Sequence, residues 1–427
     1  MIILHKAFNK LFPNIIVKEA GTYTFINGLS SLFPLLLIPL ITRYVDPFDY
    51  GVYAVFLVGI NLIMPLIGIG IETSSGRKYI DKDTIDFPSY IFSAISLTTI
   101  LSLVLLLIMY LFSNFLSNYL PISIEWYPHW VIASWSQVIF GLILVINQMR
   151  HKPFIFGFWR IGRSTLIYSF FLILIILERS KWENLLNLIF ISYTIIAISG
   201  LFWLIKKKLI ALSISKASVI HIFKYGIPLV PHMLAAAIIT ATDRIILSNI
   251  LDEKAVGIYT IGYQSGLVMF IFAQSINRAW TPWFYERLKS KNKEDYLKST
   301  MTLYKISLLF ILVGLFLCLS GWILLPYLFG GTYLESVYVF YWIIFAFVVQ
   351  GLWSLISAYL YFTGETIWIS LSSMFASILN IGISILLVMS HGLIGAAQGT
   401  FCAYLIALVF LILITLRKAP LPWLLRS

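Results

Sequence analysis

The chain has 427 residues, of which 60% are hydrophobic and only 11% are charged, and its mean hydropathy is +0.93. Soluble domains average about 25% charged residues, so this composition excludes a soluble globular protein and indicates a membrane protein. The formal net charge of +12 is expected to come from basic loops on one side of the membrane, and nucleic acid is not an expected partner.

Apolar stretches recur along the whole chain at a length that suits a lipid bilayer, because about 20 helical residues cross about 30 Å of hydrocarbon. Membrane β-strands would instead alternate in polarity over segments of about ten residues. We therefore predict an all-α integral membrane protein with about twelve transmembrane helices in two six-helix bundles. The predicted spans are 20–43, 51–71, 89–112, 127–147, 153–177, 185–205, 225–250, 255–277, 299–320, 334–361, 366–389 and 392–416.

The distribution of basic residues predicts how these spans are oriented, since cytoplasmic loops carry the excess of Lys and Arg. With the N-terminus inside, the inner segments hold 22 Lys and Arg residues and the outer loops hold 4. Both termini are therefore expected to lie in the cytoplasm. The longest inner connections, 72–88 and 278–298, are polar and without a packed-core pattern, so no extramembrane domain is expected.

A duplicated motif follows the first and the seventh span. DPFDYGVY (46–53) and DEKAVGIY (252–259) share the pattern D-x4-G-[VI]-Y at an offset of 206 residues. Both loops join equivalent spans and face the same side. We therefore predict a tandem repeat of two parallel halves, residues 1–204 and 222–427, which the cytoplasmic linker 205–221 joins.

Four prolines lie within the first and seventh spans, namely Pro34, Pro39, Pro228 and Pro231. Proline removes a backbone donor and crowds the preceding turn, so each can bend a helix. A fixed packing kink and a moving gate are both consistent with this pattern. We predict that the four prolines mark gate or kink positions.

Charged residues inside the spans are the strongest functional signal, because they are costly there and usually line a cavity. Arg160 and Arg163 are three residues apart and share one helical face. Counted from residue 153, Arg163 lies about 15 Å deep, near the midplane. No acid accompanies them in that helix, which predicts either a hydrated cationic cavity or a carboxylate partner elsewhere.

Asp243 and Arg244 lie side by side in the seventh span. Asp243 is a candidate partner for the arginines, either as a structural clamp between helices or as a charge balance in a cavity. Arg160, Arg163 and Arg244 together with Asp243 still leave a positive interior, which favours an anionic ligand. We predict that the three arginines bind substrate and that Asp243 balances their charge.

Catalytic and metal-binding motifs are absent from the sequence. It contains no G-x-S-x-G, no H-E-x-x-H, no P-loop and no His and Cys pair at metal spacing. We therefore expect no enzyme activity, no catalytic residue, no metal site and no cofactor.

Several segments resemble one transporter family. YGIPLVPHMLAAAIITATDRIILSNIL with the following VGIY, and also DYGVY, INRAWTPWFYE and HGLIGAAQG, are similar to Wzx-type polysaccharide flippases of the multidrug/oligosaccharidyl-lipid/polysaccharide (MOP) exporter superfamily. The resemblance covers nearly the whole chain. It implies alternating-access transport of an undecaprenyl-pyrophosphate-linked oligosaccharide, such as an O-antigen repeat unit, across the bacterial inner membrane. A cationic cavity would match Arg160, Arg163 and Arg244.

Two further expectations are that a Na⁺ or H⁺ gradient drives transport and that other polysaccharide-assembly membrane proteins are partners; the sequence does not name the coupling ion. Two alternatives remain open. A drug or metabolite antiporter of the same superfamily would favour acidic residues in the cavity. A membrane polymerase or acyltransferase would need a large outer loop or an intramembrane catalytic His or acid.

Overall fold

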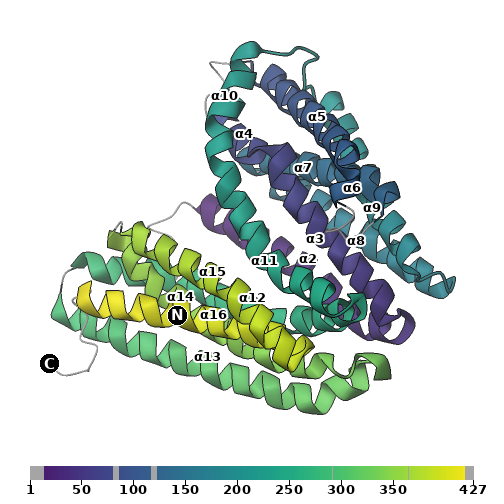
Figure 1. Cartoon of the computed structure of the whole chain (residues 1–427). Helices are drawn as coiled ribbons and strands as arrows, with labels where there is room; N and C mark the ends of the chain where they lie inside the picture. The colour runs from purple at the N-terminus through teal and green to yellow at the C-terminus, as the bar shows by residue number, and fades with distance from the viewer. Residues whose placement is uncertain (1–13, 80–85, 117–122, 291, 364, 419–427) are drawn as a thin grey trace. The chain divides into compact units, whose positions relative to one another are not determined.

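The computed structural model describes residues 14–79, 86–116, 123–290, 292–363 and 365–418, and every regular element within them is a helix (Figure 1). This result confirms the predicted all-α class. The helices are α2 (Asn14–Tyr44), α3 (Pro47–Gly68), α4 (Ile71–Tyr79), α5 (Phe87–Leu111), α6 (Ser113–Leu116), η1 (Ile124–Trp126), α7 (Tyr127–Met149), α8 (Pro153–Ile176), α9 (Trp182–Lys206), α10 (Lys216–Gly226), η2 (Ile227–Leu229), α11 (Val230–Ile250), α12 (Glu253–Ser290), α13 (Lys293–Leu328), η3 (Gly331–Tyr333), α14 (Ser336–Thr363), α15 (Thr366–His391) and α16 (Leu393–Lys418).

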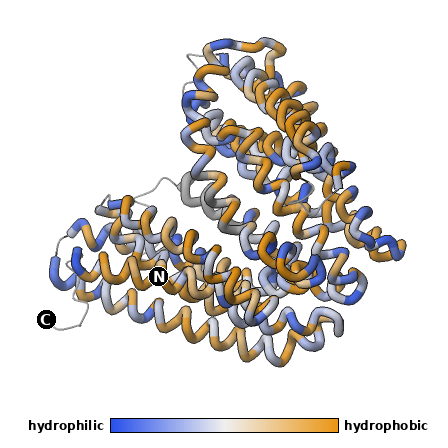
Figure 2. Tube along the Cα trace, in the orientation of Figure 1, coloured by the Kyte–Doolittle hydropathy of each residue, from blue (hydrophilic) through white to orange (hydrophobic). Residues whose placement is uncertain are grey.

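Most of these helices are apolar over much of their length, and hydrophilic residues gather at many helix ends (Figure 2). In the described part of the chain, eleven helices are long and apolar enough to cross a membrane. They correspond to all the predicted spans except the seventh, 225–250, which the structure builds from the end of α10, η2 and α11. The protein is therefore a multi-pass membrane protein.

Two of the helices extend well beyond the predicted spans. α12 continues to Ser290 and α13 begins at Lys293, so most of 278–298 is helical rather than an irregular connection. Likewise α4 occupies Ile71–Tyr79 within the predicted connection 72–88. Hydropathy marks only the part of a helix that crosses hydrocarbon, whereas backbone hydrogen bonding continues through polar residues outside it.

The contacts divide the chain into two compact units. Unit 1 contains residues 1–37 and 55–241, and unit 2 contains residues 38–54 and 242–427. The division thus differs from the predicted halves at residues 38–54 and by extending unit 1 through the linker to residue 241. The predicted tandem repeat of the sequence does not depend on this division into units, and it stays a prediction.

Unit 1 is organised around α7, which packs against α4, α5, α8 and α9. The Trp130 indole donates a hydrogen bond to the Phe56 carbonyl oxygen at 2.8 Å, which joins α7 to α3. The linker packs on the start of α5, since the Ser215 backbone N–H donates to Ser93 Oγ at 2.9 Å. This hydrogen bond fixes the linker to unit 1.

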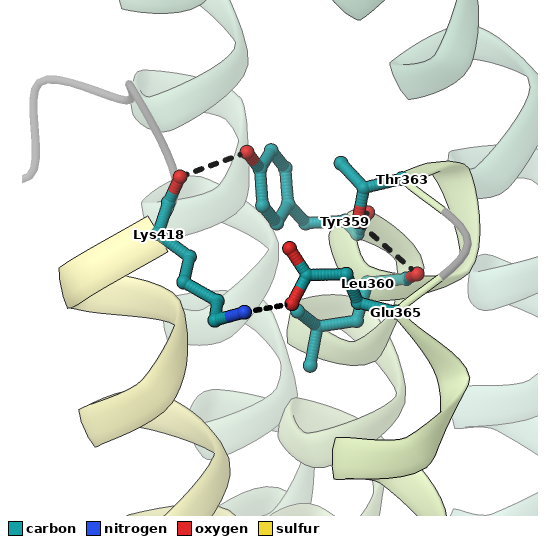
Figure 3. A network of polar contacts seen from close by, with 5 residues as sticks. All are labelled: Tyr359, Leu360, Thr363, Glu365 and Lys418. Atoms are coloured by element: carbon teal, nitrogen blue, oxygen red, sulfur yellow. Dashed lines mark hydrogen bonds and ion pairs between the residues drawn. The ribbon is translucent and has the colours of Figure 1, made fainter.

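Unit 2 is organised around α14, which packs against α12, α13 and α16. The Trp280 indole donates to the Leu355 carbonyl oxygen at 3.2 Å, between α12 and α14. At one end of this unit, Lys418 forms an ion pair with Glu365, and the Tyr359 hydroxyl donates to the Lys418 carbonyl oxygen at 3.0 Å (Figure 3). These contacts connect the end of α16 to α14 and α15.

The duplicated motifs contact each other within unit 2. A Cβ added to Gly51 would lie 1.6 Å from the Glu253 carbonyl oxygen, and one added to Gly257 would lie 1.9 Å from the Pro47 carbonyl oxygen. The 206-residue offset between the motifs pairs Pro47 with Glu253 and Gly51 with Gly257, so the two contacts are equivalent. The backbones of α3 and α12 therefore approach each other more closely than any side chain would allow.

Candidate functional site

The first charged group lies in unit 1 and is called the arginine cluster here: Arg160, Arg163, Gln137, Phe140 and Tyr193. Arg163 on α8 donates from Nη1 to Gln137 Oε1 on α7 at 2.6 Å. Its guanidinium carbon is 4.2 Å from the ring centroid of Phe140 and 5.8 Å from that of Tyr193 on α9. Aromatic faces stabilise a cation without neutralising it.

Both arginines of this cluster keep donors available. Nε of Arg160 and Nε of Arg163 are buried without a hydrogen-bond partner among the described atoms. Within the described residues neither guanidinium forms an ion pair; the side-chain acceptor of Arg163 is the neutral amide of Gln137. Buried N–H groups without acceptors are costly. An anion with several oxygen atoms would satisfy them, because a guanidinium presents a fixed fork of donors.

The second charged group lies in unit 2 and is called the aspartate cluster: Asp243, Arg244, Tyr259, Tyr263 and Thr400. Asp243 on α11 is only 4% exposed. Its Oδ2 accepts hydrogen bonds from the Tyr259 hydroxyl at 2.5 Å and from Thr400 Oγ1 at 2.9 Å. These bonds join α11 to α12 and α16, so the carboxylate connects three helices.

Arg244 faces the same tyrosines as its neighbour Asp243. Its guanidinium carbon is 4.5 Å from the Tyr263 ring centroid and 5.5 Å from that of Tyr259. One oxygen of the carboxylate, Asp243 Oδ1, is buried without a hydrogen-bond partner among the described atoms. This cluster therefore contains both signs of charge and one acceptor that is still available.

The structure thus groups Arg160 with Arg163 and Arg244 with Asp243. A pairing of Asp243 with Arg163 would join the two units and stays a prediction. Of the prolines, Pro228 lies in the 3₁₀ turn η2 and Pro231 in the first turn of α11, whereas α2 continues as one helix through Pro34 and Pro39. Their role as a gate also stays a prediction.

Sequence analysis did not single out the polar and aromatic partners of these charges. Gln137 is an amide near the middle of the predicted apolar span 127–147, a signal that could have marked it. Tyr259 ends the motif DEKAVGIY, and Thr400 directly follows HGLIGAAQG. One segment that carried the family resemblance therefore ends at Tyr259, and another ends directly before Thr400; these two residues hydrogen-bond to Asp243.

Comparison with known proteins assigns the chain to a family. Residues 16–287, more than half of the chain, match the family described as "Polysaccharide biosynthesis protein". The chain belongs to this family. A protein named "Lsg locus putative protein 1", from Haemophilus influenzae, is 21% identical over 380 residues, which cover 87% of this chain and 90% of that protein.

Solved structures of other proteins share the fold of this chain. The lipid II flippase MurJ in an inward closed conformation has a TM-score of 0.72 at 16% identity, covering 93% of this chain and 87% of that chain. An inward-facing multidrug resistance transporter of the MATE family and the MOP superfamily has a TM-score of 0.69 at 15% identity, covering 91% and 94%. The predicted resemblance to MOP-superfamily exporters is thereby confirmed.

Proposed function

We propose that this protein flips an undecaprenyl-pyrophosphate-linked oligosaccharide, such as an O-antigen or related repeat unit, across the bacterial inner membrane. One observation carries the proposal: Arg160 and Arg163 lie on one face of a membrane-spanning helix, and their buried Nε–H donors have no partner among the residues that the structure describes. A pyrophosphate is a compact polyanion that such donors can bind through several oxygen atoms.

The family and the fold support a transported lipid-linked substrate. The family description names polysaccharide biosynthesis, and one protein of the same fold is a lipid II flippase. Alternating access would let the head group cross through the protein while the lipid tail stays in the bilayer. In this proposal the first and seventh spans, α2 and α11, form the gate, and Arg244 adds to the positive cavity.

A drug or metabolite antiporter is the second candidate, and Asp243 Oδ1 is the observation that favours it. A buried carboxylate oxygen without a partner can take a proton or a cation, as cationic cargo requires. In a flippase the same oxygen would instead couple transport to a Na⁺ or H⁺ gradient. Either role requires transport to depend on Asp243 and on the ion.

Reconstitution into liposomes distinguishes these functions. Purified protein is supplied with an undecaprenyl-pyrophosphate-linked oligosaccharide, and an impermeant glycosidase reports which leaflet holds the sugar. We expect time-dependent transfer of the sugar to the opposite leaflet, faster with an imposed Na⁺ or H⁺ gradient, and no exchange of a cationic dye. Dye exchange without sugar transfer would establish the antiporter instead, and a soluble sugar product would establish an enzyme.

Cysteine labelling tests the proposed orientation, with both termini and the linker in the cytoplasm. In a background that lacks Cys318 and Cys402, an impermeant reagent should modify Asp49→Cys and Glu253→Cys from outside the cell. Lys207→Cys should react only after the membrane is permeabilised. External labelling of Lys207→Cys would reverse the orientation.

A further inference from the structure

Gln137 on α7 supplies the side-chain acceptor that holds Arg163 on α8. Its Oε1 lies 2.6 Å from Nη1 of Arg163. Glutamate has the same length and branching as glutamine, and its carboxylate would form charge-assisted bonds to the guanidinium that are roughly twice as strong. A carboxylate would, however, cancel the positive charge of Arg163. The amide therefore holds the guanidinium and leaves its charge available.

The bond to Gln137 also determines which edge of the guanidinium remains available. Nη1 is the terminal nitrogen on the same side as Cδ, so the opposite edge presents Nε–H and one N–H of Nη2 as parallel donors. Nε of Arg163 is buried and has no hydrogen-bond partner among the described residues, whereas the residue as a whole is partly exposed. The edge that Gln137 leaves therefore has two donors, which fit two oxygen atoms of one phosphate group.

Two aromatic rings restrict the position of the same guanidinium. Phe140 lies three residues after Gln137 and therefore on the same face of α7, and the guanidinium carbon of Arg163 is 4.2 Å from its ring centroid. Phe140 is only 3% exposed, so the packing around it fixes the ring. Tyr193 on α9 contributes the second ring, at 5.8 Å. The rings thus limit where the guanidinium lies, and the hydrogen bond to Gln137 limits how it rotates.

We infer that Gln137 is a positioning residue for anion binding: it holds Nη1 of Arg163 so that the Nε–Nη2 edge receives the pyrophosphate group of the substrate. This inference rests on the proposed function, because it assigns a role within the same phosphate site. It has a specific consequence for Gln137→Glu. The new carboxylate binds Arg163 more strongly, so the arginine cluster becomes more stable but binds an anion more weakly. A hydrogen bond with a purely structural role would not make stability and binding change in opposite directions.

Equilibrium binding of radiolabelled inorganic pyrophosphate to the purified full-length protein tests the inference. The Kd and the melting temperature of each variant are measured in the same detergent. We expect Gln137→Glu to weaken binding about tenfold, or about 1.4 kcal/mol, at a melting temperature equal to or above that of the unchanged protein. Gln137→Met removes the acceptor without adding charge, so it should weaken binding about threefold and lower the melting temperature.

Gln148→Glu is the matched control for the added negative charge. Gln148 is an exposed residue near the end of the same helix, where solvent and salt screen a new carboxylate. Its Kd for pyrophosphate should therefore stay within about twofold of that of the unchanged protein.

A double variant shows whether Gln137 acts through Arg163. In an Arg163→Ala protein, Gln137→Met should cause no further loss of affinity, because the side chain that Gln137 positions is absent. A further loss there would overturn the inference, as would an unchanged Kd in Gln137→Glu or a joint fall of its affinity and melting temperature. In each of these cases, weaker binding by Arg163→Ala would leave the proposed phosphate site standing. Equal binding by Arg163→Ala and the unchanged protein would instead remove that site, and the role of Gln137 with it.

Discussion

The arginine cluster of unit 1 and the aspartate cluster of unit 2 both place charge inside predicted spans. They differ in the partners that surround the charged groups. Asp243 has two hydroxyl donors, from Tyr259 and Thr400, and a neighbouring Arg244. Arg163 has a neutral amide and aromatic rings. The aspartate cluster supplies most of its own partners and connects helices, whereas the arginine cluster retains N–H donors that no described residue accepts. Substitutions that remove a partner should therefore lower folding mainly in the aspartate cluster, whereas in the arginine cluster they should lower transport with little effect on folding.

The largest expected effect is the loss of transport in Arg163→Ala. The variant loses the charge-assisted bonds to phosphate, about 1.5–3 kcal/mol, so transport should fall about 10- to 100-fold while membrane abundance stays near that of the unchanged protein. Arg163→Lys keeps the charge without the fork and should recover part of the activity. Surface polysaccharide in a complementation assay, read beside abundance, is the measurement. Normal polysaccharide from a normally abundant Arg163→Ala protein would contradict the phosphate site.

Asp243→Ala should have the opposite effect, a loss of folded protein rather than a loss of transport at normal abundance. It leaves the fully buried Tyr259 hydroxyl and Thr400 without their acceptor, which costs about 1–3 kcal/mol of folding free energy. Membrane abundance and the melting temperature in detergent should both fall. Asp243→Asn is the matched control, because its amide oxygen still accepts these bonds; it should remain abundant and lose less transport than Arg163→Ala. Equal abundance of the Ala and Asn variants would show that the carboxylate is not structural.

Unit 1 has a buried acid of its own, Glu72 on α4, outside the membrane-spanning helices. Its carboxylate packs where a Gly141 side chain would lie, and burial raises its pKa from 4.5 to about 7. The folded state therefore binds the proton more tightly, so this contribution to the free energy of unfolding is greatest below pH 4.5 and decreases as pH rises through 7.

Between about pH 6 and pH 8 this loss should be about 1 kcal/mol. Melting temperatures measured at both pH values should differ more for the unchanged protein than for Glu72→Gln, which cannot ionise. An identical pH dependence in the two proteins would mean that Glu72 is solvated.

The smallest effect is expected for Arg160→Ala. Arg160 lies about one turn nearer the helix end than Arg163, where water reaches more easily, so its interaction with an anion is more screened. Its loss should reduce transport by less than about 1 kcal/mol, or roughly fivefold. Transport assays of Arg160→Ala and Arg163→Ala at equal abundance compare the two directly. A larger defect for Arg160 would place the anion nearer the helix end.

Charge and hydropathy were sufficient to predict the all-α class and to select Arg160, Arg163, Asp243 and Arg244, because a charge in an apolar span is costly and conspicuous. The partners of these residues were not predictable by that route. Gln137, Tyr259 and Thr400 are neutral, so a search for charge passes over them, and the packing of α7, α12 and α16 identifies them as the partners. Helix ends were also missed where α12 and α13 continue into polar sequence. The placement of residues 38–54 in unit 2 depends on tertiary contacts, which span order does not encode.

The approach of Gly51 to Gly257 constrains the order of assembly during biosynthesis. Residues 38–54 pack in unit 2 together with residues that follow position 242, so the amino-terminal end of α3 is translated long before its packing partner on α12. An insertion intermediate that contains only the first six spans lacks this contact. The helix pair α2 and α3 therefore reaches its final packing only after the eighth span, α12, has entered the membrane. This holds however early α2 and α3 are inserted.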